Sequence, residues 1–355
     1  MKRVTRTAVA AVLMIGLLCF SWAGQAQAGL NFFQAFADSA LSIDGLGQTG
    51  TGGQIQTNVP NGATVVAAYM YVATVWNFSG FTDVTLHQGA NSVLLPAGGG
   101  TLLSNANDAS VRRHDVTTFV SNNISGGLQN WIVNEGIGSI DGTVLVVAYR
   151  NASTAGATAI IMDGELAQGG DTTQLGFAPY QGGAAVMSLA SSFSAGGGQF
   201  TNVDVTTSSN STPRRLTGCA GGADDGVVAN GALMTVGGIG DSTTNPNPTG
   251  CVDDELYDLA QGNAADSDPF INNGDTSLTF LTNNPSFDDN VFFIGITAGF
   301  RITDVDDIST DVPSDDTPTD DTPTDDTPTD VPSPATLMLL GLGLLGGAIV
   351  RRVRR

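Results

Sequence analysis

The sequence is poor in basic residues, and this shortage excludes one broad class of function. Its 355 residues include 13 Lys and Arg against 34 Asp and Glu, for a formal net charge of −21. Residues 29–330 contain all 34 acidic residues but only six arginines and no lysine, so this segment has a net charge near −28. A nucleic-acid-binding protein needs a basic face to neutralise phosphates, so that function is excluded.

Histidine is scarce, and familiar catalytic motifs are missing. The two histidines are His87 and His114, and the sequence has no G-x-S-x-G, no H-E-x-x-H and no phosphate loop ending in Gly-Lys-Ser/Thr. Asp115 follows His114, but adjacency alone does not make a triad, because the base must lie within hydrogen-bond reach of its nucleophile. We therefore predict no enzyme activity, no catalytic residue and no cofactor-binding residue.

Cysteine is also rare. Cys19 lies in the N-terminal segment, which leaves Cys219 and Cys251 in the rest of the chain. Two cysteines in an exported protein most simply form one disulfide. Closing the loop of about 33 residues between Cys219 and Cys251 would contribute about 3–4 kcal/mol to the free energy of unfolding on the chain-entropy model.

The N-terminus has the pattern of a secretory signal peptide. Lys2, Arg3 and Arg6 precede an apolar run over residues 8–20, and residues 26–28 (AQA) supply a small-residue cleavage site. We predict that residues 1–28 are removed before Gly29. A membrane anchor or a buried first helix is the alternative.

The C-terminus combines an apolar run with a basic end. Residues 335–350 contain no charge, and 16 helical residues span about 24 Å, somewhat short of the bilayer core. A short transmembrane helix is predicted, with membrane thinning and arginine snorkelling to make up the length. The arginines that would keep this end in the cytoplasm are Arg351, Arg352, Arg354 and Arg355.

A short motif stands at the start of this run. It consists of Val331, Pro332, Ser333, Pro334, Ala335, Thr336 and Leu337. Together, this motif, the Gly/Leu-rich stretch and the arginine cluster resemble the PEP-CTERM sorting signal of Gram-negative bacteria. This sequence has Ser333 at the position where that family usually has glutamate. The resemblance implies that exosortase-like machinery in the inner membrane processes the C-terminus, commonly alongside exopolysaccharide production. It implies no activity for the rest of the chain.

A spacer precedes the motif. Residues 304–330 consist mainly of Asp, Thr and Pro, and the unit DDTPT occurs three times between residues 315 and 329. Proline removes backbone donors and the aspartates repel one another, so we predict a disordered, extended linker. At about 3.1 Å per residue it would reach roughly 80 Å. A calcium-dependent stiffener is the rival interpretation.

Residues 29–303 show the pattern of an all-β body. Short runs of β-branched and aromatic residues alternate with Gly, Asn, Asp and Ser clusters. The strand candidates are residues 64–76, 83–87, 92–95, 143–150, 157–162, 172–177, 184–193, 232–236, 277–281 and 291–302. Both faces of 64–76 and 143–150 are apolar, which predicts strands between two packed layers. We predict a jelly-roll-like β-sandwich, with two sandwich subdomains as the alternative.

Parts of this body resemble an uncharacterised β-sandwich domain of prokaryotic surface proteins. The similarity rests on residues 115–120 (DVTTFV), 141–149 (DGTVLVVAY) and 162–164 (MDG), and continues in 230–238 and 253–259. The resemblance implies structural signatures, with no catalytic assignment.

Calcium and sugar are the ligands that the residue types favour. Loop carboxylates are oxygen ligands that Ca²⁺ prefers, and weak candidates for a structural Ca²⁺ are Asp253, Asp254, Asp288 and Asp289. No cofactor is otherwise expected. Trp76, Trp131 and Tyr180 would stack on sugars if exposed, although such side chains more often fill a sandwich core.

These features predict four segments: a signal peptide (1–28), a β-sandwich ectodomain (29–303), a linker (304–330) and a sorting signal (331–355). The protein would be anchored in the inner membrane during sorting and then lie at the cell surface or outside the cell. Our first hypothesis is a non-enzymatic surface or matrix protein that contacts exopolysaccharide or other surface proteins. A carbohydrate-binding module is the second, and a secreted hydrolase with paired carboxylates is the third.

Overall fold

The computed structural model describes residues 29–47, 51–74, 80–103, 110–136, 140–166, 169–192, 200–221, 234–249, 255–285 and 290–302. These residues belong to one compact unit of the chain. The predicted signal peptide, linker and sorting signal lie outside them. Within the described residues no helix is long and apolar enough to cross a membrane.

The first half of the body winds as a jelly roll of two antiparallel sheets. Its strands are β2 (Ala40–Gly47), β3 (Gly52–Val59), β4 (Thr64–Thr74), β5 (Val84–Gln88), β6 (Asn91–Leu95), β7 (Thr101–Leu102), β8 (Val111–Asp115), β9 (Gly127–Asn134) and β10 (Ile140–Arg150). The first inner sheet has the order β2-β10-β4-β8-β7, and the first outer sheet has the order β3-β9-β5-β6. A short helix, α2 (Thr117–Asn123), joins β8 to β9. This double Greek-key order defines a jelly roll.

The second half repeats the same winding. Its strands are β11 (Thr158–Glu165), β12 (Thr172–Gly176), β13 (Ala185–Ser192), β14 (Thr201–Thr207), β15 (Arg214–Ala220), β16 (Met234–Val236), β17 (Leu256–Asp258), β18 (Ser277–Asn283) and β19 (Asn290–Ala298). The second inner sheet has the order β1-β11-β19-β13-β16, where β1 (Gly29–Ala37) is added at the edge and β17 also pairs with β13. The second outer sheet has the order β12-β18-β14-β15. The jelly-roll prediction is therefore confirmed, and the roll occurs twice.

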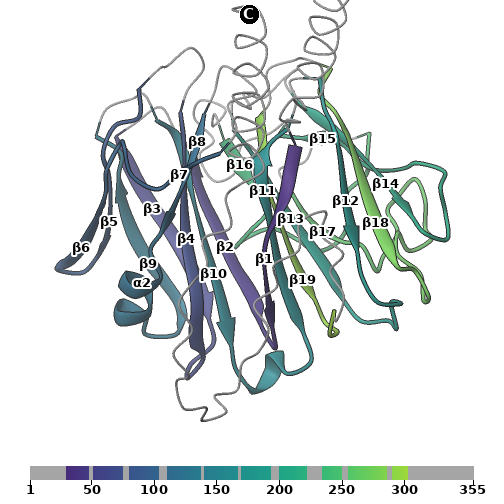
Figure 1. The fold of residues 1–355 in the computed structure, drawn as a ribbon, viewed down its shortest axis with the longest axis horizontal. Coiled ribbons are helices and arrows are strands. Elements are labelled where there is room, and N and C mark those ends of the chain that lie inside the picture. The colour runs from purple at the N-terminus through teal and green to yellow at the C-terminus, as the bar shows by residue number, and fades with distance from the viewer. Residues whose placement is uncertain are drawn as a thin grey trace, which may run out of the picture. The chain divides into compact units, whose positions relative to one another are not determined.

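The four sheets stack as layers, with the two inner sheets face to face (Figure 1). On β4, Met70 and Val72 pack toward the first outer sheet, while Tyr71 and Ala73 pack toward the second roll. Alternate residues of a strand point to opposite faces, so a strand between two layers must be apolar on both. The prediction of buried central strands at 64–76 and 143–150 is confirmed by β4 and β10.

The edge strand β3 is held to the first roll by side chains of β2. Asn58 donates its backbone N–H to Ser42 Oγ at 2.8 Å, and Gln56 donates its own to the Asp44 carboxylate. β3 pairs with β9 along one edge only, so the backbone N–H groups on its other edge have no partner strand. The bonds to Ser42 and Asp44 satisfy two of these N–H groups. Burial raises the pKa of Asp44 to about 7.

Candidate functional site

A polar bridge joins the two rolls across their interface. Tyr71 on β4 donates its hydroxyl to Asp163 Oδ2 on β11 at 2.7 Å, and Arg113 on β8 forms an ion pair with the same oxygen. The Arg113 guanidinium also lies over the Phe33 ring, 3.2 Å from its centroid. Burial raises the pKa of the Tyr71 phenol, so this group remains a donor. The bridge neutralises a buried carboxylate and fixes one roll against the other.

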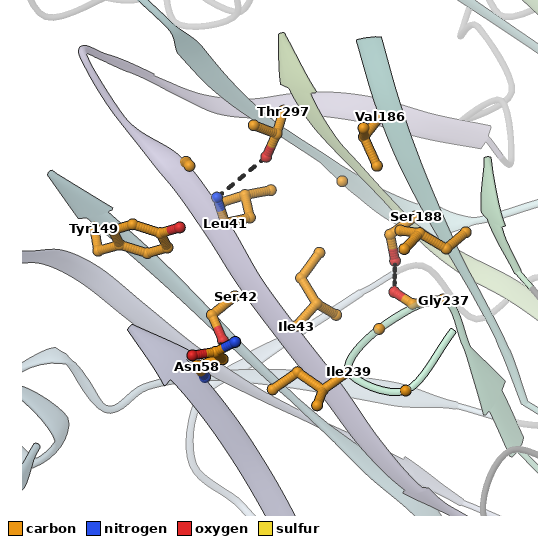
Figure 2. Close-up of a pocket in the computed structure, with 15 residues that line it drawn as sticks. Leu41, Ser42, Ile43, Asn58, Tyr149, Val186, Ser188, Gly237, Ile239 and Thr297 are labelled. Atoms are coloured by element: carbon orange, nitrogen blue, oxygen red, sulfur yellow. Dashed lines mark hydrogen bonds between the residues drawn. The ribbon is translucent and has the colours of Figure 1, made fainter. Parts of the chain in front are cut away.

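The seam pocket is a cavity of about 400 Å³ at one side of the same interface (Figure 2). The first roll supplies Leu41, Ser42 and Asn58, and the second supplies Val186 and Ser188 from the opposite side. Cavities that take small molecules have this size, with apolar walls and a few converging polar groups. The pocket therefore has the dimensions of a ligand site.

Two polar groups of the seam pocket are available to a ligand. Ser188 already donates to the Gly237 carbonyl, and Thr297 Oγ1 accepts the backbone N–H of Leu41 at 3.1 Å. The Asn58 side-chain amide and the Tyr149 hydroxyl have no such partner among the residues that the structure describes. Burial raises the pKa of Tyr149, so its hydroxyl stays protonated. This set of neutral donors and acceptors suits an uncharged, hydroxyl-rich ligand.

Glycines keep one wall of the seam pocket thin. A Cβ atom at Gly237 would lie 2.2 Å from the Glu255 carbonyl oxygen, and one at Gly238 would lie 2.5 Å from that of Ile43. Asp241 closes the turn by accepting the Gly238 N–H at 2.9 Å. The segment therefore lies tightly between the rolls, and larger residues there would displace it.

A second hollow opens beside α2 on the first roll. It has a volume of about 890 Å³ and is lined partly by Gln34, Tyr69, Asp115 and Asn122. Gln34 is already engaged, because it accepts the Tyr69 hydroxyl at 2.7 Å. The hollow is lined by the Asp115 carboxyl group, whereas the seam pocket has no acidic side chain, so the seam pocket suits an uncharged ligand better.

The calcium prediction concerns residues beyond the described ranges. Asp253, Asp254, Asp288 and Asp289 all lie outside the described residues, so that prediction remains a prediction. Within the described ranges, no group of three or more His, Cys, Asp or Glu side chains is arranged to hold a metal.

The disulfide also remains a prediction. Cys219 on β15 is buried, and Cys251 lies outside the described residues.

The aromatic candidates belong to the core where they are described. Trp131 is fully buried and donates Nε1–H to Thr57 Oγ1 at 2.9 Å. Tyr180 is buried and packs edge-on against Phe300. The core interpretation of both residues is confirmed, and Trp76 lies outside the described residues.

Comparison with protein families identifies the C-terminus. Residues 330–355 match the family model of the PEP-CTERM protein-sorting motif. The chain carries a PEP-CTERM sorting motif. This motif implies export, sorting at a membrane and processing by exosortase-type machinery, so the protein is a sorted extracellular protein. No curated protein matches the sequence.

Solved structures resemble the body only distantly. One is described as PNGF-II (9% identity, TM-score 0.23), with 77% of this chain and 65% of that chain covered. The major capsid protein P2 from bacteriophage PM2 has 10% identity and a TM-score of 0.19, with 73% and 97% covered. The CBM22-1-CBM22-2 tandem domain of Paenibacillus barcinonensis Xyn10C has 7% identity and a TM-score of 0.18, with 78% and 99% covered. This chain thus spans just under two thirds of PNGF-II. TM-scores this low do not assign a function to the chain.

Proposed function

We propose that this chain is a non-enzymatic surface or matrix protein, in which the double jelly roll is the working part outside the cell. The observation that carries the proposal is the PEP-CTERM motif at residues 330–355, because a sorting signal delivers whatever precedes it. The acidic composition fits this role, since a net charge far from zero keeps an exposed protein soluble. Most of the described chain is sandwich framework, which supports a structural or adhesive task.

Removing the sorting motif tests the proposal. We expect that deletion of residues 330–355 abolishes delivery of the body to the cell surface and medium, because the recognition segment is lost. Fractionation followed by mass spectrometry of the C-terminal peptide measures both location and processing. Deletion of residues 315–329 is the control, since it shortens the spacer and keeps the motif, and it should leave delivery unchanged. Full-length protein found soluble in the cytosol, with both ends uncut, would contradict the proposal.

A second candidate function is glycan binding in the seam pocket. The supporting observation is the pairing of two available neutral groups, the Asn58 amide and the Tyr149 hydroxyl, with the apolar walls formed by Leu41 and Val186. Sugars present both hydroxyls and apolar C–H faces, which this combination can satisfy. The role would be non-catalytic and would hold the protein to surface polysaccharide.

Two substitutions separate the seam pocket from the rest of the surface. Asn58→Ala and Tyr149→Phe should each weaken polysaccharide binding about three- to tenfold, because each removes one hydrogen bond worth roughly 1 kcal/mol. Asn122→Ala changes the same kind of side chain in the hollow beside α2, and it should have no effect. Binding to a polysaccharide array, followed by titration calorimetry, measures these changes. Binding that is lost in Asn122→Ala but kept in Asn58→Ala would refute the assignment.

A further inference from the structure

The outward face of the first outer sheet contains no acidic or basic residue apart from one histidine. We call it the neutral face. Cross-strand pairing places Gln54 opposite Ile132, Ile132 opposite His87 and His87 opposite Ser92. The neutral face consists of Gln54, Gln56, Thr85, His87, Ser92, Leu94, Leu128, Asn130, Ile132 and Asn134.

This neutrality contrasts with the rest of the protein. Residues 29–330 have a net charge near −28, and each arginine is already bonded within its own chain. The partners are Gly99 for Arg112, Asp163 for Arg113, Ala37 for Arg150, Asp266 for Arg214, Asp204 for Arg215 and Asp38 for Arg301. A strongly basic partner would therefore be drawn to the acidic surfaces and away from the neutral face.

The neutral face also gathers the exposed apolar side chains. Large hydrophobic residues that are well exposed in the described structure are Leu128 (60%), Leu94 (56%), Ile132 (46%) and Leu102 (46%). The first three lie on the neutral face, and Leu102 lies on β7 of the first inner sheet. These three side chains stand singly among polar ones, with Leu128 and Ile132 four residues apart on β9 and Leu94 two strands away, so they add apolar area to the face without forming one continuous patch.

We propose that the neutral face is where a second copy of this chain docks. Two acidic bodies can approach closely only where neither presents charge. The amides of the face suit this pairing, because each Asn and Gln both donates and accepts hydrogen bonds and can therefore bond to its own kind across a two-fold axis. Gln56 Nε2 already donates to Asn130 Oδ1 at 2.7 Å, which orders one such pair. Aliphatic side chains lack the flat π-face that stacks on sugars, so the face suits protein better than glycan.

The size of the face sets the strength of this contact. Two strands of eight residues and two of five, at about 3.4 Å per residue and about 4.8 Å between strands, give a footprint of about 420 Å² per copy. A pair would bury about 850 Å² in total, which is the size of a weak, transient contact. The dimer is therefore weak in dilute solution and becomes populated where copies are crowded together. The inference concerns the body alone and does not depend on how the chain is exported.

Salt gives the contact a distinctive signature. The two bodies repel each other through their net charges, and the Debye length falls from about 10 Å at 0.1 M salt to about 3 Å at 1 M. Self-association through the neutral face must therefore strengthen as salt rises. A contact made by opposite charges would weaken under the same change.

Sedimentation velocity of the purified full-length chain tests the proposal. We expect a reversible dimer with a dissociation constant on the order of 100 μM, tighter at high salt than at low salt. Ile132→Glu should raise this constant at least tenfold, because it brings two buried carboxylates together across the interface. Leu102→Glu is the matched control, since Leu102 has the same 46% exposure on a different sheet, and it should leave the constant unchanged.

Three results would overturn the proposal. The first is a wild-type chain that stays monomeric up to about 1 mM in high salt. The second is equal loss of association in Ile132→Glu and Leu102→Glu, which would point to a general effect of added charge or to the C-terminal segment. The third is association that weakens with salt. Circular dichroism of both variants shows whether each has folded, and Ile132→Asn, which retains a neutral side chain, provides a milder version of the same test.

Discussion

Replacing Glu135 with methionine is expected to raise the free energy of unfolding at pH 8 by about 2–4 kcal/mol. Glu135 follows β9 and is fully buried, and neither of its carboxyl oxygens has a hydrogen-bond partner in the described structure. Burial raises the pKa of this carboxyl from 4.5 to about 8. Methionine has a similar length and carries no charge, so the free-energy cost of burying an ionised carboxylate disappears.

The pH dependence of this effect identifies its cause. Because the pKa of Glu135 is higher in the folded state than in the unfolded state, the folded chain binds more protons between pH 4.5 and about 8. The stability that the protein has while Glu135 is protonated is fully present below pH 4.5, and it is lost as the pH rises from 4.5 through about 8. Wild-type protein should therefore be more stable at pH 5 than at pH 8, and Asp44 adds a change of the same sign up to about pH 7.

Denaturant unfolding at several pH values measures the free energy of unfolding of wild type, Glu135→Met and Glu135→Gln. The stability gap between Glu135→Met and wild type should widen from pH 5 to pH 8. Glu135→Gln should flatten the pH dependence in the same way but stabilise less, because an amide is still buried without partners. A gap that is independent of pH would contradict the assignment of the cost to ionisation.

Arg113→Met is expected to destabilise the protein by about 3–5 kcal/mol. The substitution leaves Asp163 with the Tyr71 hydroxyl as its remaining partner in the bridge, at a site where the Asp163 side chain is only 7% exposed. Removing one member of a buried ion pair leaves a charge that neither water nor a counter-ion compensates. The double variant Arg113→Met/Asp163→Leu should recover most of the loss, since it removes both charges.

A second ion pair in the same chain supplies the control. Arg215 pairs with Asp204 on the second outer sheet, where the side chains are 43% and 25% exposed. Arg215→Met should cost less than about 1 kcal/mol, because water screens the exposed pair. Chemical denaturation compares the variants. Equal losses at the two sites would show that burial of the Arg113 bridge adds nothing.

The central strands of the two inner sheets could be predicted from the sequence, whereas β1, β2, β8 and several outer strands could not. β4 and β10 are unbroken apolar runs because both of their faces are buried. β3 (GGQIQTNV) and β9 (GLQNWIVN) bury one face only, and their other face consists largely of Asn, Gln and Gly, which are typical of loops. Their alternation of buried and exposed positions was the signal that was available.

The candidate sites also combine local features that the sequence shows with long-range contacts that it does not show. Alternation along β8 places Arg113 and Asp115 on one face, opposite Tyr71 and Tyr69 of β4. The partner of Arg113, Asp163, lies 50 residues away and could not be found by spacing. The seam pocket gathers residues from Ala40 to Thr297, so only the folding of one roll onto the other creates it.

The position of β19 bears on how the body responds to force. This strand is the last one described before the C-terminal segments, and it lies between β11 and β13, antiparallel to both. A pull transmitted through the predicted tether acts along β19, so it loads two ladders of backbone hydrogen bonds in shear, all at once. Strands at an edge, by contrast, can be peeled away one bond at a time. The central position of β19 therefore favours resistance of the second roll to a force applied through its C-terminal end.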